Sequence, residues 1–236
     1  MARLDLVHVN QKLGTCFVQP LEAKKLPPAS LRLGQDIVLK KRLALGTGRD
    51  SLLEVELPRA TPPVTVRLGS SSGIEFRPDG SIKVHKGSFL FSHSNSLQWM
   101  ISSRDSSIRI EGSGTWMVEC LSVGLKLILL EGEIILNNQV EVKNLTSGDL
   151  VLLSGSSSTG TKPIQIELPL LLGTSRLINQ LDHPLPSMPR MVSAARVQAL
   201  RLKKRYEAFV GDVTEEKKLQ LWTLPYDQGG ETVADH

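Results

Sequence analysis

A short serine-rich stretch, GSSSG at residues 69–73, is the first place in this sequence where chemistry could occur. Its G-x-S-x-G spacing is that of a nucleophile elbow, in which a strand turns sharply into a helix and exposes the serine. Ser71 would be the nucleophile, with Asp182 and His183 downstream as its partners. The run after Gly73 is typical of another strand, so a serine-rich turn is the favoured interpretation. A serine hydrolase using Ser71 is the alternative.

Metal and nucleotide chemistry find little support in the spacing of the residues. A metal site needs closely spaced nitrogen, sulfur or carboxylate ligands, but the histidines of this chain occur singly. They are His8, His85, His93, His183 and His236. The stretch GTGRDS at Gly46 lacks the third glycine and the following helix of a dinucleotide loop, so it predicts a hairpin loop. We therefore expect no catalytic residues, no cofactor and no metal site.

The bulk composition is that of a folded protein. The chain has 236 residues, of which 40% are hydrophobic and 22% are charged, so it can bury a core without the help of a disulfide or a metal. Cys16 and Cys120 either form one disulfide or remain two buried thiols. No apolar run approaches the ~18 residues of a membrane span. The start, MARLDLVHVNQKLG, lacks the apolar core of a secretory signal.

Short strands separated by turns fill the first two thirds of the sequence. Runs such as SLLEVEL and VTVRL alternate apolar and polar residues, and Pro78, Asp79 and Gly80 predict a hairpin turn. No long helical pattern lies between these strands, which favours an antiparallel sandwich or barrel over a parallel sheet. The prediction is a β domain over residues 1–166.

Glycines interrupt the apolar strands of residues 108–134, IRIEGSGTWMVECLSVGLKLILLEGEI. Glycine inside a strand lets the backbone bend, take a positive φ or approach another strand closely. We therefore interpret Gly112, Gly114, Gly124 and Gly132 as corners of a curved sheet. The run LKLILL is apolar on both sides, which indicates a strand inside a layered structure.

The C-terminal segment, residues 167–236, has a different pattern. Apolar residues at helical spacing, among them Val192, Ala195 and Ala199, predict an amphipathic helix over about residues 192–209, followed by a polar tail. Between residues 190 and 218, eight Lys or Arg stand against four Asp or Glu, which accounts for the whole net charge of +4. A solvated basic face is the default interpretation, and we expect no nucleic-acid partner. An interaction surface would use Arg196, Lys203, Lys204 and Arg205.

One family resemblance follows from the stretch GSGTWMVECLSVGLKLILLEGEIILNNQVEVKNLTSGDLVLL. It resembles the FecR domain of bacterial envelope proteins, which shows a Gly-Thr-aromatic-x-Val element, an apolar strand ending in Glu-Gly and a later Gly-containing turn. The matching residues are Gly114, Thr115, Trp116 and Val118, then Glu131 and Gly132, then Gly148 and Asp149. Upstream, LGTGRDSLLEVEL, VRLGSSSGIEF and VHKGSFLF also resemble that domain, so the resemblance covers about residues 30–155.

The resemblance implies a non-catalytic, mainly β, jelly-roll-like antiparallel sandwich that binds other proteins. The signalling members relay the state of an outer-membrane receptor to a sigma factor. This chain shows no membrane span and no N-terminal segment that would hold a sigma factor, so only the extracytoplasmic β domain is implied. The implied location is periplasmic or envelope-associated, or cytoplasmic if the start as written is the genuine one. A metal-free, cupin-like barrel that binds a small ligand is the second alternative.

Overall fold

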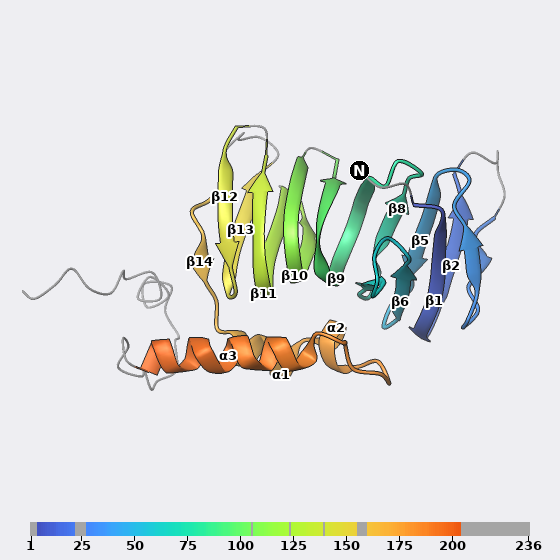
Figure 1. The fold of residues 1–236 in the computed structure, drawn as a ribbon. Helices are drawn as coiled ribbons and strands as arrows, with labels where there is room; N and C mark the ends of the chain where they lie inside the picture. Colours follow the sequence, from blue (N-terminus) through green and yellow to red (C-terminus); the bar gives the residue numbers. More distant parts are fainter. Residues whose placement is uncertain are drawn as a thin grey trace, which may run out of the picture.

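Antiparallel strands make up most of the protein, and three helices follow them (Figure 1). The computed structural model describes residues 4–21, 27–104, 106–122, 124–138, 140–154 and 160–203. The strands are β1 (Leu6–Leu13), β2 (Cys16–Pro20), β3 (Ala29–Ser30), β4 (Asp36–Val38), β5 (Leu43–Thr47), β6 (Leu52–Leu57), β7 (Val64–Leu68), β8 (Gly73–Phe76), β9 (Ile82–Ser102), β10 (Ser107–Leu121), β11 (Gly124–Asn137), β12 (Val142–Thr146), β13 (Asp149–Ser154) and β14 (Ile164–Gln165). The helices are α1 (Leu168–Thr174), α2 (Arg176–Asn179) and α3 (Met188–Lys203). The expected fold class, a mainly antiparallel β structure with a short C-terminal helical segment, is confirmed.

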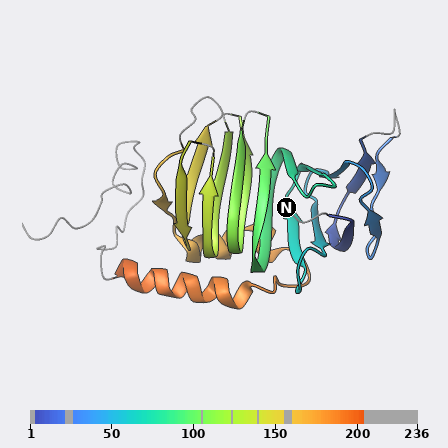
Figure 2. The ribbon, with the colours of Figure 1, turned by 45° about the horizontal axis from the view of Figure 1, so that its top comes forward.

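The strands form two layers that share the long strands β9, β10 and β11, which lie side by side in Figure 2. The helix-side layer has the order β4-β1-β6-β7-β9-β10-β11-β13-β14. The open-side layer uses the other parts of the long strands, which pair with β8 and β12, and continues through β5, β2 and β3. The path ends at β14 and β4 without closing, so the described strands do not form the barrel of the cupin-like alternative.

Two of the long strands, β10 and β11, pass from one layer to the other at a pair of glycines. Gly114 of β10 faces Gly132 of β11, and β11 pairs with β13 before this point and with β12 after it. Both glycines have positive φ, +141° and +96°. A Cβ on Gly114 would lie 2.1 Å from the carbonyl oxygen of Glu131, and one on Gly132 would lie 2.3 Å from that of Ser113. No side chain fits here, which confirms these two glycines as corners.

The main hydrophobic core lies between the two layers. Aliphatic side chains fill it from both sides, together with the aromatic rings of Phe91, Trp99 and Trp116. Phe91 and Trp116 stack with their ring centroids 4.2 Å apart. The strand predicted to be apolar on both sides, β11, directs Leu127 into this core and Ile128 into a second one.

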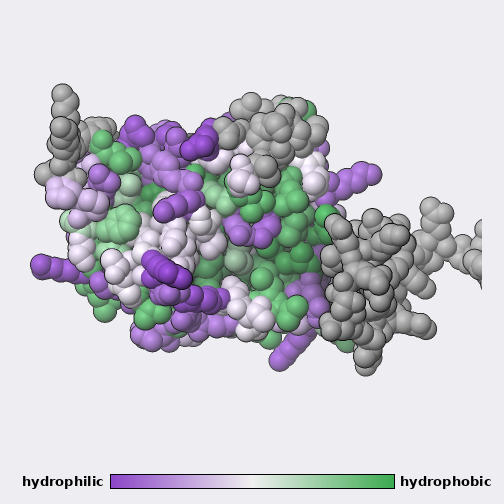
Figure 3. Space-filling view, turned by 180° about the vertical axis from the view of Figure 1, so that it is seen from behind, coloured by the Kyte–Doolittle hydropathy of each residue, from purple (hydrophilic) through white to green (hydrophobic). Residues whose placement is uncertain are grey.

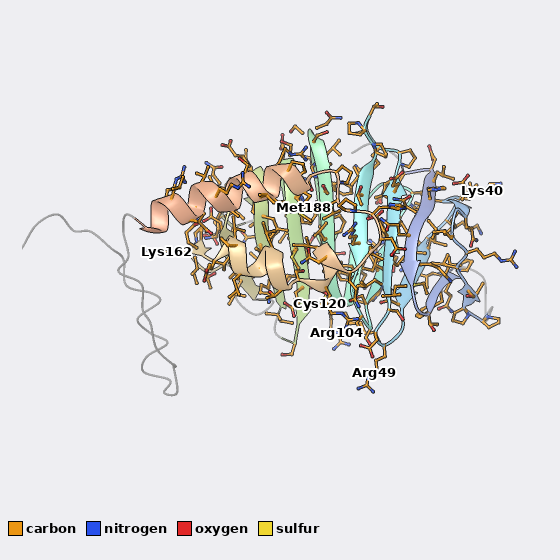
Figure 4. The ribbon with its side chains drawn as sticks, turned by 90° about the horizontal axis from the view of Figure 1, so that it is seen from below. Lys40, Arg49, Arg104, Cys120, Lys162 and Met188 are labelled. Atoms are coloured by element: carbon orange, nitrogen blue, oxygen red, sulfur yellow. The ribbon has the colours of Figure 1, made fainter. Side chains whose placement is uncertain are left out.

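The second core lies between the helix-side layer and the helices. Leu90 and Leu130 from the sheet pack there against Ile178 and Met191 from the helical segment. Seen from below, the helices lie across the strands (Figure 4). In this region the helix-side layer is therefore covered on both faces, by the main core on one side and by the helices on the other.

Helix α3 differs in two respects from the helix predicted over residues 192–209. It begins earlier, at Met188, because Pro189 falls in the first turn, where a helix needs no donor from the backbone. Residues 204–209 lie outside the described residues. The buried face holds Ala195 and Gln198, whereas the predicted apolar residue Ala199 is exposed.

One core histidine, His93, has surroundings that favour the neutral ring. His93 is buried, and its Nε2 accepts the indole N–H groups of Trp99 (3.2 Å) and Trp116 (3.4 Å). Its Nδ1 therefore carries the proton and donates to the carbonyl oxygen of Asn95 at 2.8 Å. Burial, the largest cause, lowers the pKa of His93 below 6.5. A second proton on Nε2 would face two donors, so the neutral ring fits this site.

The first prediction concerns the glycine corner. Gly132→Ala should lower the free energy of unfolding by about 2 kcal/mol or more, because the new Cβ meets the Ser113 carbonyl and the φ of +96° is strained for alanine. Gly173→Ala is the matched control, since nothing lies within 4 Å of its Cβ position in α1. It should change stability by less than about 1 kcal/mol. Urea unfolding measures both, and equal effects would contradict the corner.

The second prediction is that His93 makes the stability of the fold depend on pH. Because the folded chain holds His93 neutral, the stability this site contributes is fully present above pH ~6.5 and is lost as the pH falls toward the folded pKa. Wild type should therefore lose more unfolding free energy between about pH 7.5 and about pH 5 than His93→Gln, whose side chain does not titrate. Urea unfolding at several pH values measures the two slopes. Parallel curves would show that His93 is not the group responsible.

Candidate interaction site

The residues of the FecR-like motif lie together around the middle of β10 and β11. Trp116 and Val118 point into the main core, and Gly114 and Gly132 form the corner. The remaining motif residues, Thr115, Glu131, Gly148 and Asp149, are buried and hold polar contacts or a tight turn. The structure thus brings all eight positions into one region of the scaffold.

Thr115 and Glu131 connect this region to the start of α3. The Thr115 hydroxyl donates to Glu131 Oε1 at 2.8 Å and lies 3.0 Å from the Ser92 hydroxyl, which in turn bonds Ser187 at 2.9 Å. Arg190 donates to both carboxylate oxygens of Glu131, at 3.1 and 3.2 Å. Two motif residues therefore tie the helix to the sheet.

Gly148 and Asp149 hold the turn that precedes β13. Gly148 has a φ of +94°, and a Cβ there would lie 2.5 Å from Nε2 of Gln198 in α3. Asp149 accepts the backbone N–H of Thr146 at 2.7 Å. Gln198 donates to the Ile166 carbonyl at 2.6 Å and accepts the N–H of Leu168 at 2.8 Å. This turn therefore seats the middle of α3.

A buried ion pair holds the segment between α2 and α3. Arg67 of β7 is fully buried and donates from Nε to Glu54 Oε2 at 2.6 Å. Its other nitrogens donate to the carbonyl oxygens of Leu177, Ile178 and His183, at 2.9, 2.9 and 2.7 Å. The carbonyls at the end of a helix lack partners within the helix, and Arg67 supplies donors to them.

Gln11 completes this attachment. It donates to Glu54 Oε1 at 2.7 Å and accepts the backbone N–H of His183 at 2.8 Å. Both carboxylate oxygens of Glu54 are thus occupied. The VTVRL alternation of the sequence placed Arg67 on the polar face of its strand, and this face is covered by the helical segment rather than by water.

The Ser71 alternative lacks the expected surroundings. Ser71 lies in the turn between β7 and β8 with a φ of +52°, so the turn is sharp, but strand β8 follows it instead of a helix. Among the described residues, no hydrogen bond joins Ser71 to a histidine. His85, the histidine nearest to Ser71 in the sequence, instead has its Nε2 3.5 Å from Glu75 Oε2. The elbow and its partners are therefore not assembled in the described chain.

Glu75 is held as a carboxylate by two arginines. Arg42 and Arg77 donate from Nε to Glu75 Oε1 at 2.7 and 2.8 Å. Burial alone would raise the pKa of Glu75, but the hydrogen bonds and charges of the two guanidinium groups outweigh it and lower the pKa to about 2. A carboxylate with such a low pKa is a poor proton donor or acceptor near neutral pH.

The two cysteines, whose pairing the sequence left open, are both free thiols. Cys16 is buried, and burial raises its pKa. Burial and the charge of Glu119 raise the pKa of Cys120 to about 11. Within the described part of the chain, no three His, Cys, Asp or Glu side chains gather as metal ligands would.

An open groove lies where the loop before α3 meets the helix. Its lining includes Pro184, Pro186, Met188, Val192 and Arg196. Figure 4 places Met188 at the start of α3 on the underside of the molecule. From behind, hydrophobic colour gathers on the half of the protein that carries the C-terminal strands (Figure 3).

The four residues predicted as an interaction surface fall on both sides of the limit of the described chain. Arg196 is exposed at the groove. Lys203 is the last residue of α3, but its side chain is outside the description, as are Lys204 and Arg205 entirely. The basic charge of Arg196 allowed it to be predicted from the sequence. The groove beside it, which three prolines help to line, has no sequence pattern that would have predicted it.

No family model matches the chain, and no curated protein does. Two similar solved structures are crystal structures, at 2.50 and 1.65 Å, of a candidate anti-sigma factor from Parabacteroides distasonis ATCC 8503. The first has a TM-score of 0.45 and 10% sequence identity and covers 57% of this chain. The second has a TM-score of 0.45 and 9% sequence identity and covers 56% of this chain. The chain spans 65% of the length of each. A likeness this weak says nothing about activity or partner.

Within the described residues, no helix combines the length and the apolar character that crossing a membrane requires.

The third prediction concerns the buried pair. Arg67→Met should lower the unfolding free energy by about 3–5 kcal/mol, because Glu54 and three carbonyls lose their donor in a buried place. Arg176→Met is the control, since its ion pair with Asp50 is exposed, and it should cost less than about 1 kcal/mol. Urea unfolding measures both. A small effect at Arg67 would mean that this pair does not hold the helical segment.

Proposed function

We propose that this chain is a non-catalytic recognition module of the FecR type, which binds a protein partner at the bacterial cell envelope. The observation that carries the proposal is the use made of its buried ionisable side chains. Hydrogen bonds to other groups of the scaffold are made by each of five of them: Glu54, Arg67, Glu75, Glu131 and Asp149. These contacts support a structural use of the five side chains.

The motif residues support the same proposal. They form the corner, the core and the contacts that seat α3, so the resemblance to the FecR domain rests on residues that build a scaffold. Because these residues build the fold, we place the recognition of a partner on other residues, at the surface of the protein. The cell-envelope location rests on the family resemblance alone.

The fourth prediction tests this function. The purified chain, immobilised on a resin, should retain a specific protein from envelope extracts of its own organism, and the purified partner should then bind by calorimetry with a defined stoichiometry. Ser71→Ala should bind equally well, because Ser71 lies in a turn and not in a reaction centre. Bare resin and a heat-unfolded sample of the chain are the controls.

Two results would contradict the proposal. One is the absence of any partner that binds the folded chain but not the unfolded one. The other is a hydrolytic activity on ester substrates that Ser71→Ala abolishes, which would restore the serine hydrolase alternative.

A further inference from the structure

The groove at the start of α3 is mainly apolar, rich in proline and open to solvent. Pro184, Pro186 and Pro189 contribute to its lining, with Leu185 buried and Met188 and Val192 half-buried. Proline fixes its own φ, so the walls of this groove lose little conformational entropy when a ligand enters.

An apolar stripe continues from the groove along the exposed side of α3. Val197 is 46% exposed and Leu200 is 64% exposed. Val197 and Leu200 are three residues apart, as neighbours on one face of a helix are, and the stretch from Val192 in the groove to Leu200 is about 12 Å long at 1.5 Å per residue. A stripe of this length matches about two turns of a partner helix, which would use residues at i, i+3 or i+4 and i+7 as anchors.

The charged residues of α3 itself are all basic. Residues 183–201 contain Arg190, Arg196 and Arg201 and no Asp or Glu. Arg190 pairs with Glu131 of the sheet. Among the described residues, Arg196 and Arg201 have no ion-pair partner, and both are exposed. A basic rim without ion-pair partners in the described part of the chain complements acidic residues that flank apolar anchors.

We propose that the groove and stripe of α3 bind an acidic amphipathic helix of a protein partner. Apolar side chains of that helix enter the groove and lie along Val197 and Leu200, while its carboxylates face Arg196 and Arg201. This inference rests on the proposed function and assigns it a surface. A second copy of the chain that docked through this same face would bring arginines against arginines. A flat anionic membrane would leave the concave groove unfilled.

The first arm of the test uses a designed probe. A fluorescent peptide that repeats Glu-Ile-Ala-Ala-Leu-Glu-Glu should bind the full-length chain, as measured by fluorescence anisotropy, and should bind more weakly as salt rises from about 50 to about 300 mM. Arg196→Glu should weaken binding roughly tenfold or more, since a like charge then faces the peptide. Leu200→Ser should also weaken it. Arg104→Glu, the same charge change on the loop between β9 and β10, should have no effect.

Several results would overturn this assignment. One is that the acidic peptide does not bind. Another is that a matched peptide with lysine in place of glutamate binds as tightly as the acidic one. A third is that Arg104→Glu weakens binding as much as Arg196→Glu does. Binding to phosphatidylglycerol vesicles but not to the peptide would assign the surface to lipid. Binding that appears only after Glu215→Gln and Glu216→Gln would mean that the chain's own C-terminal segment occupies the groove.

The second arm separates this inference from the function on which it rests. The partner recovered from envelope extracts is measured against wild type and Arg196→Glu. A loss of at least roughly tenfold supports the groove as the binding surface. If Arg196→Glu binds the partner as wild type does, only the groove assignment fails. If no partner is recovered at all, the proposed function itself fails.

Discussion

The close approach of β10 and β11 at Gly114 and Gly132 is the constraint on which the rest of the structure depends. There the carbonyl oxygens of Ser113 and Glu131 occupy the space that side chains would need. Because the strands can bend at this point, one part of each lies in the helix-side layer and the other in the open-side layer. That arrangement encloses the main core between the layers and leaves the outer face of one layer for the helical segment.

The helical segment is fixed by polar contacts as well as by apolar packing. A buried ion pair adds little net stability compared with apolar residues of the same size, but an unpaired buried charge costs several kcal/mol. Arg67, Glu54 and Gln11 are therefore satisfied together only when the backbone around His183 lies in one place. The same argument applies to Glu131 and Arg190. These contacts set the position of α3, and with it the position of the groove.

Local patterns in the sequence predicted the strands and corners well, because each depends on neighbouring residues. Pro78, Asp79 and Gly80 form the expected turn, in which Gly80 has a φ of +80°. The face of α3 was harder to predict, since the buried residue Gln198 is polar and is satisfied only by partners far along the chain. The residues that form α1 and α2 show no clear helical pattern in the sequence. The burial of Arg67 could not be predicted either, because it depends on a segment about 110 residues away.

Recognition is proposed for one surface of a scaffold whose buried polar side chains hold its strands and helices in place. Hydrogen–deuterium exchange of the full-length chain, with and without its purified partner, tests this most directly. The partner should slow exchange in peptides covering residues 184–201 and leave exchange in the loops around Ser71 unchanged. Slowed exchange around Ser71 and the β8–β9 loop, with residues 184–201 unaffected, would contradict it.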